Sequence, residues 1–137
     1  MTEIELKDYL TQYRNKKEGN QIYIDALTRY RQTLETFPPY IAKEYIKDID
    51  DRIKTSSDDI RKQDGIVLAW SELISNYNAR QIFIDHYING MDWDTIEDAQ
   101  HYARSTVYGY HKKALTEITQ KAVQDIADNS TITAISI

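Results

Sequence analysis

Apolar residues in the first half of the chain recur every three or four positions, the spacing of one face of an α-helix. This pattern predicts four helices, over residues 3–17, 21–36, 41–53 and 59–76. We expect breaks at Gly19 and Asn20, at Pro38 and Pro39, and at the polar stretch 55–58, because glycine weakens a helix and proline cannot continue its hydrogen bonds. Gly65 weakens the centre of the last helix. The first half is therefore predicted to be a helical hairpin or bundle.

The second half contains two short helical patterns in succession. The first begins near residue 79 and closes at Asn89 and Gly90, where a glycine serves as C-cap. Asp92 is a good N-cap for the second helix, in which Ile96 and Ala99 are expected to face inward. A short break is expected at residues 101–102.

A longer third helix is predicted to begin at residue 103 or 104, with an inward stripe of Val107, His111, Ala114 and Ile118. Two short helices, a tight break and a longer helix are typical of a helix-turn-helix. The fold class is therefore predicted to be all-α, with a helical N-terminal region over residues 1–76 and a helix-turn-helix over residues 77–128. Residues 129–137 (NSTITAISI) are expected to form a flexible tail, with an edge strand as the alternative.

The composition fits a soluble helical protein. Hydrophobic residues make up 41% and charged residues 28%, while 4 glycines and 2 prolines are too few for a many-stranded sandwich or barrel. The absence of cysteine excludes a disulfide framework and a thiolate zinc site. No apolar run approaches the ~18 residues of a membrane span, so we expect neither a membrane segment nor a signal peptide.

Charge is distributed unevenly along the chain. The net charge of −5 does not by itself indicate nucleic-acid binding. Residues 65–102 hold one basic side chain against six acidic ones, whereas residues 103–121 hold four basic side chains against one acidic. A local basic face can bind phosphate on an acidic protein, because salt screens charges beyond ~10 Å.

A helix-turn-helix places its last helix in the DNA major groove, where side chains reach base edges and phosphates. The candidate DNA-binding residues lie on the face of the predicted third helix away from Val107: Arg104, Ser105, Thr106, Tyr108, Lys112 and Lys113. Arginine can read guanine edges, the hydroxyl groups can bond bases or phosphates, and the two lysines suit backbone phosphates.

Two stretches, RQIFIDHYINGMDW over residues 80–93 and ARSTVYGYHKKAL over residues 103–115, resemble the DNA-reading region 4 of sigma-70-type factors. They are more closely similar to ArpU/RinA-type phage transcriptional regulators of Gram-positive hosts, over roughly residues 78–118. The resemblance implies a transcription regulator, specifically an activator of phage late genes, that binds double-stranded DNA in the cytoplasm of a bacterial host cell. Residues 1–76 would then serve self-association, giving a homo-oligomer, or contact with RNA polymerase.

The chain departs from that family pattern at three positions. Glu97 stands where a small residue lets the two helices approach closely, and Gln100 stands where leucine is usual. Gly109 replaces a polar or basic groove residue, and glycine costs a mid-helix position ~1 kcal/mol relative to alanine.

Other chemically capable residues have simpler structural explanations. Tyr87, Trp93 and His111 are expected to pack in the core. His86 and His101 lack metal-ligand spacing, and no catalytic or nucleotide-binding motif is present. We therefore expect no metal, no cofactor and no enzyme activity.

Two alternative functions fit the same pattern. The three departures, the acidic segment 85–98 and the net charge suit a helical adaptor whose sigma-like domain contacts protein instead of DNA. The second alternative is a DNA-recognition subunit of a phage packaging machine.

Overall fold

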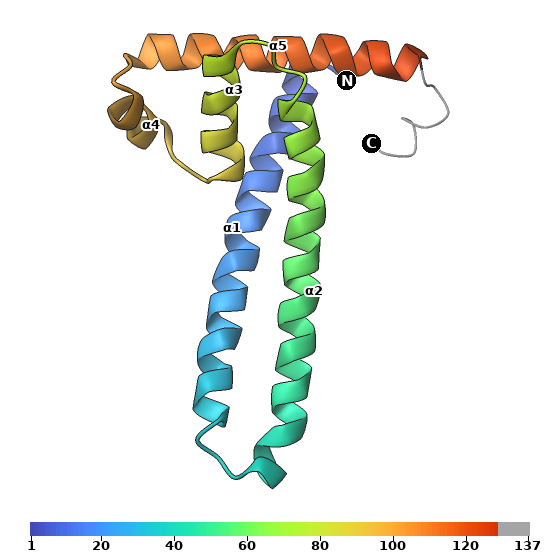
Figure 1. Ribbon diagram of the computed structural model, residues 1–137, viewed down its shortest axis with the longest axis vertical. Coiled ribbons are helices and arrows are strands. Elements are labelled where there is room, and N and C mark those ends of the chain that lie inside the picture. The colour runs from blue at the N-terminus through green and yellow to red at the C-terminus, as the bar shows by residue number, and fades with distance from the viewer. Residues whose placement is uncertain (129–137) are drawn as a thin grey trace. The chain divides into compact units, whose positions relative to one another are not determined.

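The computed structural model describes residues 1–128, which form helices joined by short turns (Figure 1). In chain order the elements are α1 (Glu3–Leu34), α2 (Pro39–Ser71), α3 (Tyr77–Phe83), the π-helix η1 (Ile84–Ile88), α4 (Trp93–Gln100) and α5 (Arg104–Asp128). No strand occurs among these described residues, and the predicted all-α fold class is confirmed. The expected tail 129–137 lies outside the described residues.

The first half of the chain contains two long helices where the sequence pattern predicts four. α1 runs through Gly19 and Asn20, and α2 runs through residues 55–58, so the breaks predicted there are wrong. α2 also continues through Gly65. A single glycine costs a helix only ~1 kcal/mol, which packing easily offsets. Within the polar stretch, the hydroxyl of Thr55 donates to the carbonyl four residues earlier (2.9 Å). This hydroxyl therefore bonds to its own helix instead of ending it.

The break predicted at the two prolines is confirmed. α1 ends at Leu34, and Pro39 is the first residue of α2. Proline suits this position because its missing N–H would have no partner inside the helix and its fixed φ is already helical. The carbonyl of Pro38 accepts hydrogen bonds from the amides of Ile41 (3.0 Å) and Ala42 (3.1 Å).

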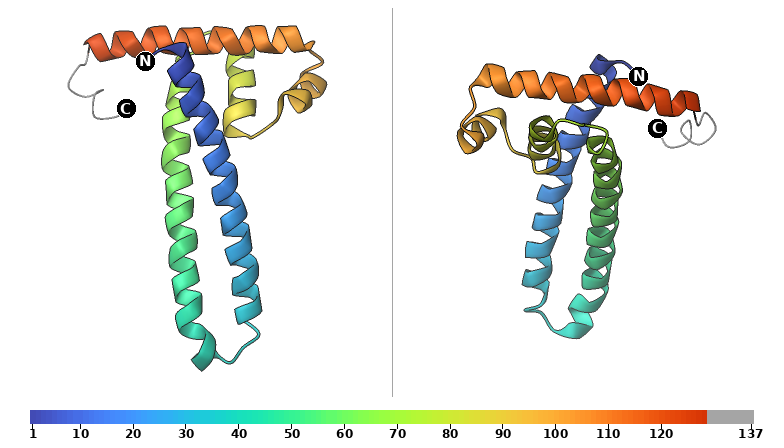
Figure 2. Two further views of the ribbon diagram at one scale, coloured as in Figure 1. Left: turned by 180° about the vertical axis from the view of Figure 1, so that it is seen from behind. Right: turned by 45° about the horizontal axis from the view of Figure 1, so that its top comes forward.

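The chain divides into two compact units. The hairpin unit is Asn15–Asp64, and the main unit combines Met1–Arg14 with the described residues from Gly65 to Asp128. In the hairpin unit, parts of α1 and α2 run side by side in opposite directions (Figure 2), around a core of Leu34, Ala42 and Ile49. This division differs from the expected boundary at residue 76.

The main unit includes more than the predicted helix-turn-helix, because the start of α1 and the end of α2 both contribute residues to its core. One cluster joins residues of α1, α2, α3, η1 and α5 and of the connection between α2 and α3: Leu6, Leu10, Tyr13, Val67, Trp70, Ile74, Ala79, Phe83, Tyr87, Ala114, Leu115 and Ile118. A second cluster consists of Ile82, Ile96 and Val107, and both α3 and α4 pack against α5.

The burial of individual residues tests the predicted helix faces. The inward stripe of α5 is confirmed, since Val107, His111, Ala114 and Ile118 are all buried. In α4, Ile96 is buried but Ala99 is exposed, so the inward orientation predicted for Ala99 is wrong. The position four residues after Ile96 is Gln100, and this side chain turns toward the core side instead.

Candidate functional site

The chain passes from α3 to α4 through a π-helical turn. The Asn89 amide donates to the carbonyl of Ile84, five residues back (3.0 Å), and Gly90 has φ 74°, a value that favours glycine. The predicted closure at Asn89 and Gly90 is thus confirmed. The side chain of Asp92 accepts a hydrogen bond from the Thr95 amide (2.8 Å), which confirms the predicted N-cap of α4.

A tight turn then leads from α4 into α5. His101 takes a left-handed conformation (φ 58°), and α5 begins three residues later at Arg104, so the predicted break is confirmed. Ile96 of α4 and Val107 of α5 meet Ile82 in one apolar cluster. This contact fixes which side of α5 faces the core and which side faces solvent.

The predicted DNA-binding side chains are all exposed in the first three turns of α5: Arg104, Ser105, Thr106, Tyr108, Lys112 and Lys113. The buried stripe begins at Val107, so these side chains lie around the rest of the helix circumference. The sequence has no acidic residue between positions 99 and 116. All six predicted residues are thus exposed on the first three turns of one helix, and that part of the helix contains no acidic residue.

Gly109 lies in the middle of this exposed face. A Cβ added there would meet no described atom within 4 Å. A shallow depression of about 410 Å³ opens beside it, lined by Gly109, Lys112, Lys113, Thr116, Glu117 and Gln120. Because glycine has no side chain, a ligand could approach the helix backbone closely at this point.

Arg104 is exposed but already paired. Its Nε donates to Glu97 Oε1 (2.8 Å), and its Nη2 contacts the carboxylate of Asp94. The hydrogen bond to Glu97, followed by the nearby negative charges, raises the pKa of the Arg104 guanidinium above its ordinary value. Sequence reasoning missed this pairing, although opposite charges on both sides of a tight turn were the signal for it. The pairing gives Glu97 a structural role in the turn between α4 and α5.

A layer of rings packs against the inner side of α5. The indole of Trp93 stacks on His86 (centroids 3.7 Å apart) and meets His111 (4.8 Å) and Tyr108 (5.5 Å) edge-on. The hydroxyl of Tyr87 lies 2.7 Å from Nε2 of His111. Burial lowers the pKa of both histidines to about 4, so both rings are neutral near pH 7. The core positions predicted for Tyr87 and His111 are confirmed, while Trp93 is half-buried.

A buried carboxylate holds the turn between α3 and α4. Asp85 accepts hydrogen bonds from the side-chain amides of Gln81 (3.1 Å), Asn89 (3.2 Å) and Gln100 (3.5 Å). Gln100, the second departure from the family pattern, thus supplies a polar partner that leucine could not. A buried carboxylate without such partners would be costly.

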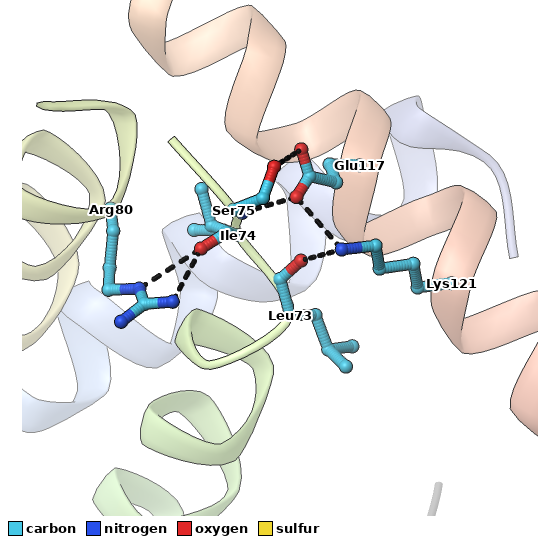
Figure 3. A network of polar contacts seen from close by, with 6 residues as sticks. All are labelled: Leu73, Ile74, Ser75, Arg80, Glu117 and Lys121. Atoms are coloured by element: carbon cyan, nitrogen blue, oxygen red, sulfur yellow. Dashed lines mark hydrogen bonds and ion pairs between the residues drawn. The ribbon is translucent and has the colours of Figure 1, made fainter. Parts of the chain in front are cut away.

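The connection between α2 and α3 is attached to α5 by a polar network (Figure 3). Ser75 donates from its backbone amide and its hydroxyl to the Glu117 carboxylate. Lys121 donates to the same carboxylate (3.0 Å) and to the Leu73 carbonyl (2.8 Å). Burial works to raise the pKa of Glu117, but the hydrogen bonds from Ser75 and Lys121 outweigh it and hold that pKa below its ordinary value. Glu117 and Lys121 therefore stabilise the fold.

Two arginines bind backbone carbonyls of the main unit. Arg14 donates through Nε to the carbonyl of His86 (3.1 Å) and through Nη2 to that of Gly90 (3.0 Å). Arg80 donates twice to the carbonyl of Ile74 (3.0 and 2.7 Å), as Figure 3 shows. These carbonyls lie near or just beyond helix ends, where no following helical turn supplies a donor. Sequence reasoning missed Arg14, because its partners lie more than seventy residues away in the chain.

The described part of the chain contains no group of three His, Asp or Glu side chains placed to hold a metal ion. No helix within it combines the length and apolar character needed to cross a membrane. No family model, curated protein or solved structure matches the chain.

Proposed function

We propose that the chain is a DNA-binding transcription regulator that inserts α5 into the major groove of duplex DNA. The observation that carries the proposal is the exposed face of α5, where polar and basic side chains cluster over three turns of a helix segment that itself contains no acidic residue. α4 and the ring layer of His86, Trp93 and His111 support this helix from its inner side. The resemblance to ArpU/RinA-type phage regulators supports the same function and adds the activation of phage late genes.

The exposed residues divide into two roles. Lys112 and Lys113 would hold phosphates, while Ser105 and Tyr108 would reach base edges. Arg104 would exchange its carboxylate partners for a guanine. Each of the two exposed ion pairs of Arg104 contributes about 0–1 kcal/mol, whereas a bidentate contact to guanine contributes ~1–3 kcal/mol. The exchange is therefore favourable when the correct base is present.

The test is to select, from a library of duplex DNA, the sequences that the purified full chain binds at physiological salt. Affinities for the selected sequences are then measured at several salt concentrations. We expect enrichment of one sequence. The double variant Lys112→Ala, Lys113→Ala should weaken binding to every duplex. It should also reduce the slope of log affinity against log salt by about two, since each phosphate contact releases about one counterion.

The matched control is the double variant Lys43→Ala, Lys47→Ala, which removes the same charge from exposed positions of α2. This control should bind DNA like the parent. Arg104→Ala and Tyr108→Ala should instead reduce the preference for the enriched sequence. Equal losses for the two lysine pairs, or no enriched sequence, would contradict the proposal.

Contact with a protein is the second candidate function, and the acidic residues of α4 favour it. Asp94 and Glu97 pair with Arg104, so the first turn of α5 carries no surplus positive charge in the free chain. Affinity for duplex DNA that stays weak, falls steeply with salt and shows no sequence preference would support this candidate.

A further inference from the structure

The hairpin unit has a small core and a large exposed apolar surface. Its buried residues Leu34, Ala42 and Ile49 lie between two helices, whereas helical bundles commonly enclose their core with four. A unit of this size rarely gains more than ~3–5 kcal/mol from its core alone. Seven large apolar or aromatic side chains of the unit are 41% to 86% exposed: Ile22, Tyr23, Tyr30, Phe37, Tyr40, Ile41 and Tyr45.

One face of α1 carries an uncharged stripe within this unit. The stripe consists of Gly19, Tyr23, Ala26, Tyr30 and Thr33, all of them exposed. Their spacing alternates between four and three residues, which is the spacing of a helix–helix seam. Leu27 and Leu34, which pack in the core shared with α2, each follow a stripe residue by one position. The stripe is therefore a second face beside the one already used.

α2 extends this surface. Nη1 of Arg52 donates to the hydroxyl of Tyr23 (3.5 Å), so the side of α2 that bears Arg52 adjoins the stripe. Tyr45 and Ile41 precede Arg52 by seven and eleven residues, and this spacing places them on the same side of the helix. Both are exposed.

Charge and area favour a second copy of the chain as the occupant of this surface. Residues 15–64 hold ten basic and ten acidic side chains, so two hairpin units do not repel each other and neither attracts a polyanion. Tyr23, Tyr30, Ile41 and Tyr45, which lie on this surface, offer on the order of 400 Å² of exposed area per copy. That area matches the apolar share of the ~800 Å² that each partner contributes to a standard interface.

We propose that the hairpin unit pairs with a second copy of itself, with the two α1 stripes running antiparallel. Tyrosines alternate with small residues along the stripe, so one register places Tyr23 over the partner's Ala26. By the same two-fold symmetry, Tyr30 then lies over the partner's Gly19. Large side chains facing small ones are what a well-packed seam requires.

This pairing gives Gly19 a physical role. A Cβ there would meet no described atom within 4 Å, and glycine inside a helix costs ~1 kcal/mol. In the dimer, the space above Gly19 receives a tyrosine ring. The proposal does not rest on DNA binding, so either proposal can fail without the other.

The first test is sedimentation equilibrium of the full chain over a range of concentrations, where we expect a dimer. Ala26→Glu places like charges close together in the seam and should raise the dissociation constant on the order of a hundredfold. Gln32→Glu adds the same charge to α1 at an exposed position outside the stripe and should leave the constant unchanged. A monomeric parent, or equal effects of the two variants, would overturn the proposal.

A distance measurement tests the orientation and stays decisive if Ala26→Glu fails to fold. The chain has no cysteine, so a spin label on Thr33→Cys is unique. The proposed antiparallel register separates the two labels by about 25 Å along the helix axis, from the 1.5 Å rise per residue. Parallel stripes would bring the labels to within about 10 Å, the interaxial distance of packed helices, and would overturn the register.

Discussion

At the scale of single residues, two buried histidines couple the stability of the main unit to pH. His86 and His111 are each less than a tenth exposed and lie against the indole of Trp93. Burial lowers the pKa of both from 6.5 to about 4. Between these values the unfolded chain binds more protons than the folded chain, so the free energy of unfolding rises with pH in this window.

We expect the free energy of unfolding, measured in urea, to fall as the pH is lowered from 6.5 toward 4. One pKa unit corresponds to about 1.4 kcal/mol, so His111 accounts for on the order of 2 to 3 kcal/mol of this loss. His111→Gln keeps a polar partner for Tyr87 but removes one of the two titrating rings, and it should reduce the pH dependence to the part that His86 contributes. The exposed control His101→Asn should retain the slope of the parent, since asparagine tolerates the left-handed conformation. An unchanged slope in His111→Gln would contradict this account.

At the scale of elements, the short helices depend on their caps. The side chain of Asn76 accepts a hydrogen bond from the Ala79 amide (2.9 Å) at the start of α3, and Asp92 does the same for α4. α4 has 8 residues, which is too short for a helix to be stable by itself in water. Its cap and the burial of Ile96 must therefore hold it in place, and with it the turn that leads into α5.

Asp92→Ala should lower the free energy of unfolding by about 1 kcal/mol, because the Thr95 amide loses its partner. Asp92→Asn should retain most of the stability, since asparagine is an equally good cap. The control Asp98→Ala removes the same charge from an exposed position of α4 and should not lower stability. Thermal or urea unfolding measures all three. Equal losses for Asp92→Ala and Asp98→Ala would show that charge, and not capping, is responsible.

At the scale of the whole molecule, burial and charge are divided unequally between the two units. The hairpin unit has no net charge and a core of three buried residues, whereas the main unit carries the charge of −5 and two apolar clusters. The free energy of local opening follows the density of buried contacts. The hairpin unit should therefore open more easily than the main unit.

Hydrogen exchange followed by mass spectrometry should show faster exchange over residues 15–64 than over the buried turns of α3 and η1 at low protein concentration. Raising the concentration should protect residues 19–33, where the seam between copies is proposed, and leave residues 107–118 unchanged. Equal protection of both units in dilute solution would contradict the difference in core size.

The sequence alone determined those features that depend on neighbouring residues. The helical period predicts the buried stripe from Val107 to Ile118, Pro39 begins a helix, and Asp92 caps one. The exposure of the predicted DNA-binding residues follows from the same period, because the stripe that is buried leaves the remaining positions outward.

Tertiary structure decided what depends on distant partners. α1 continues through Gly19 because it packs against α2, although the local helix propensity of glycine favours a break. The turn between α4 and α5 brings Arg104 to Glu97, and the fold brings Arg14 to the carbonyl of His86. Caps, prolines and periodicity act over a few residues and are written in the local sequence. A contact between two distant segments depends on where the fold places each of them, and local sequence patterns do not predict those positions.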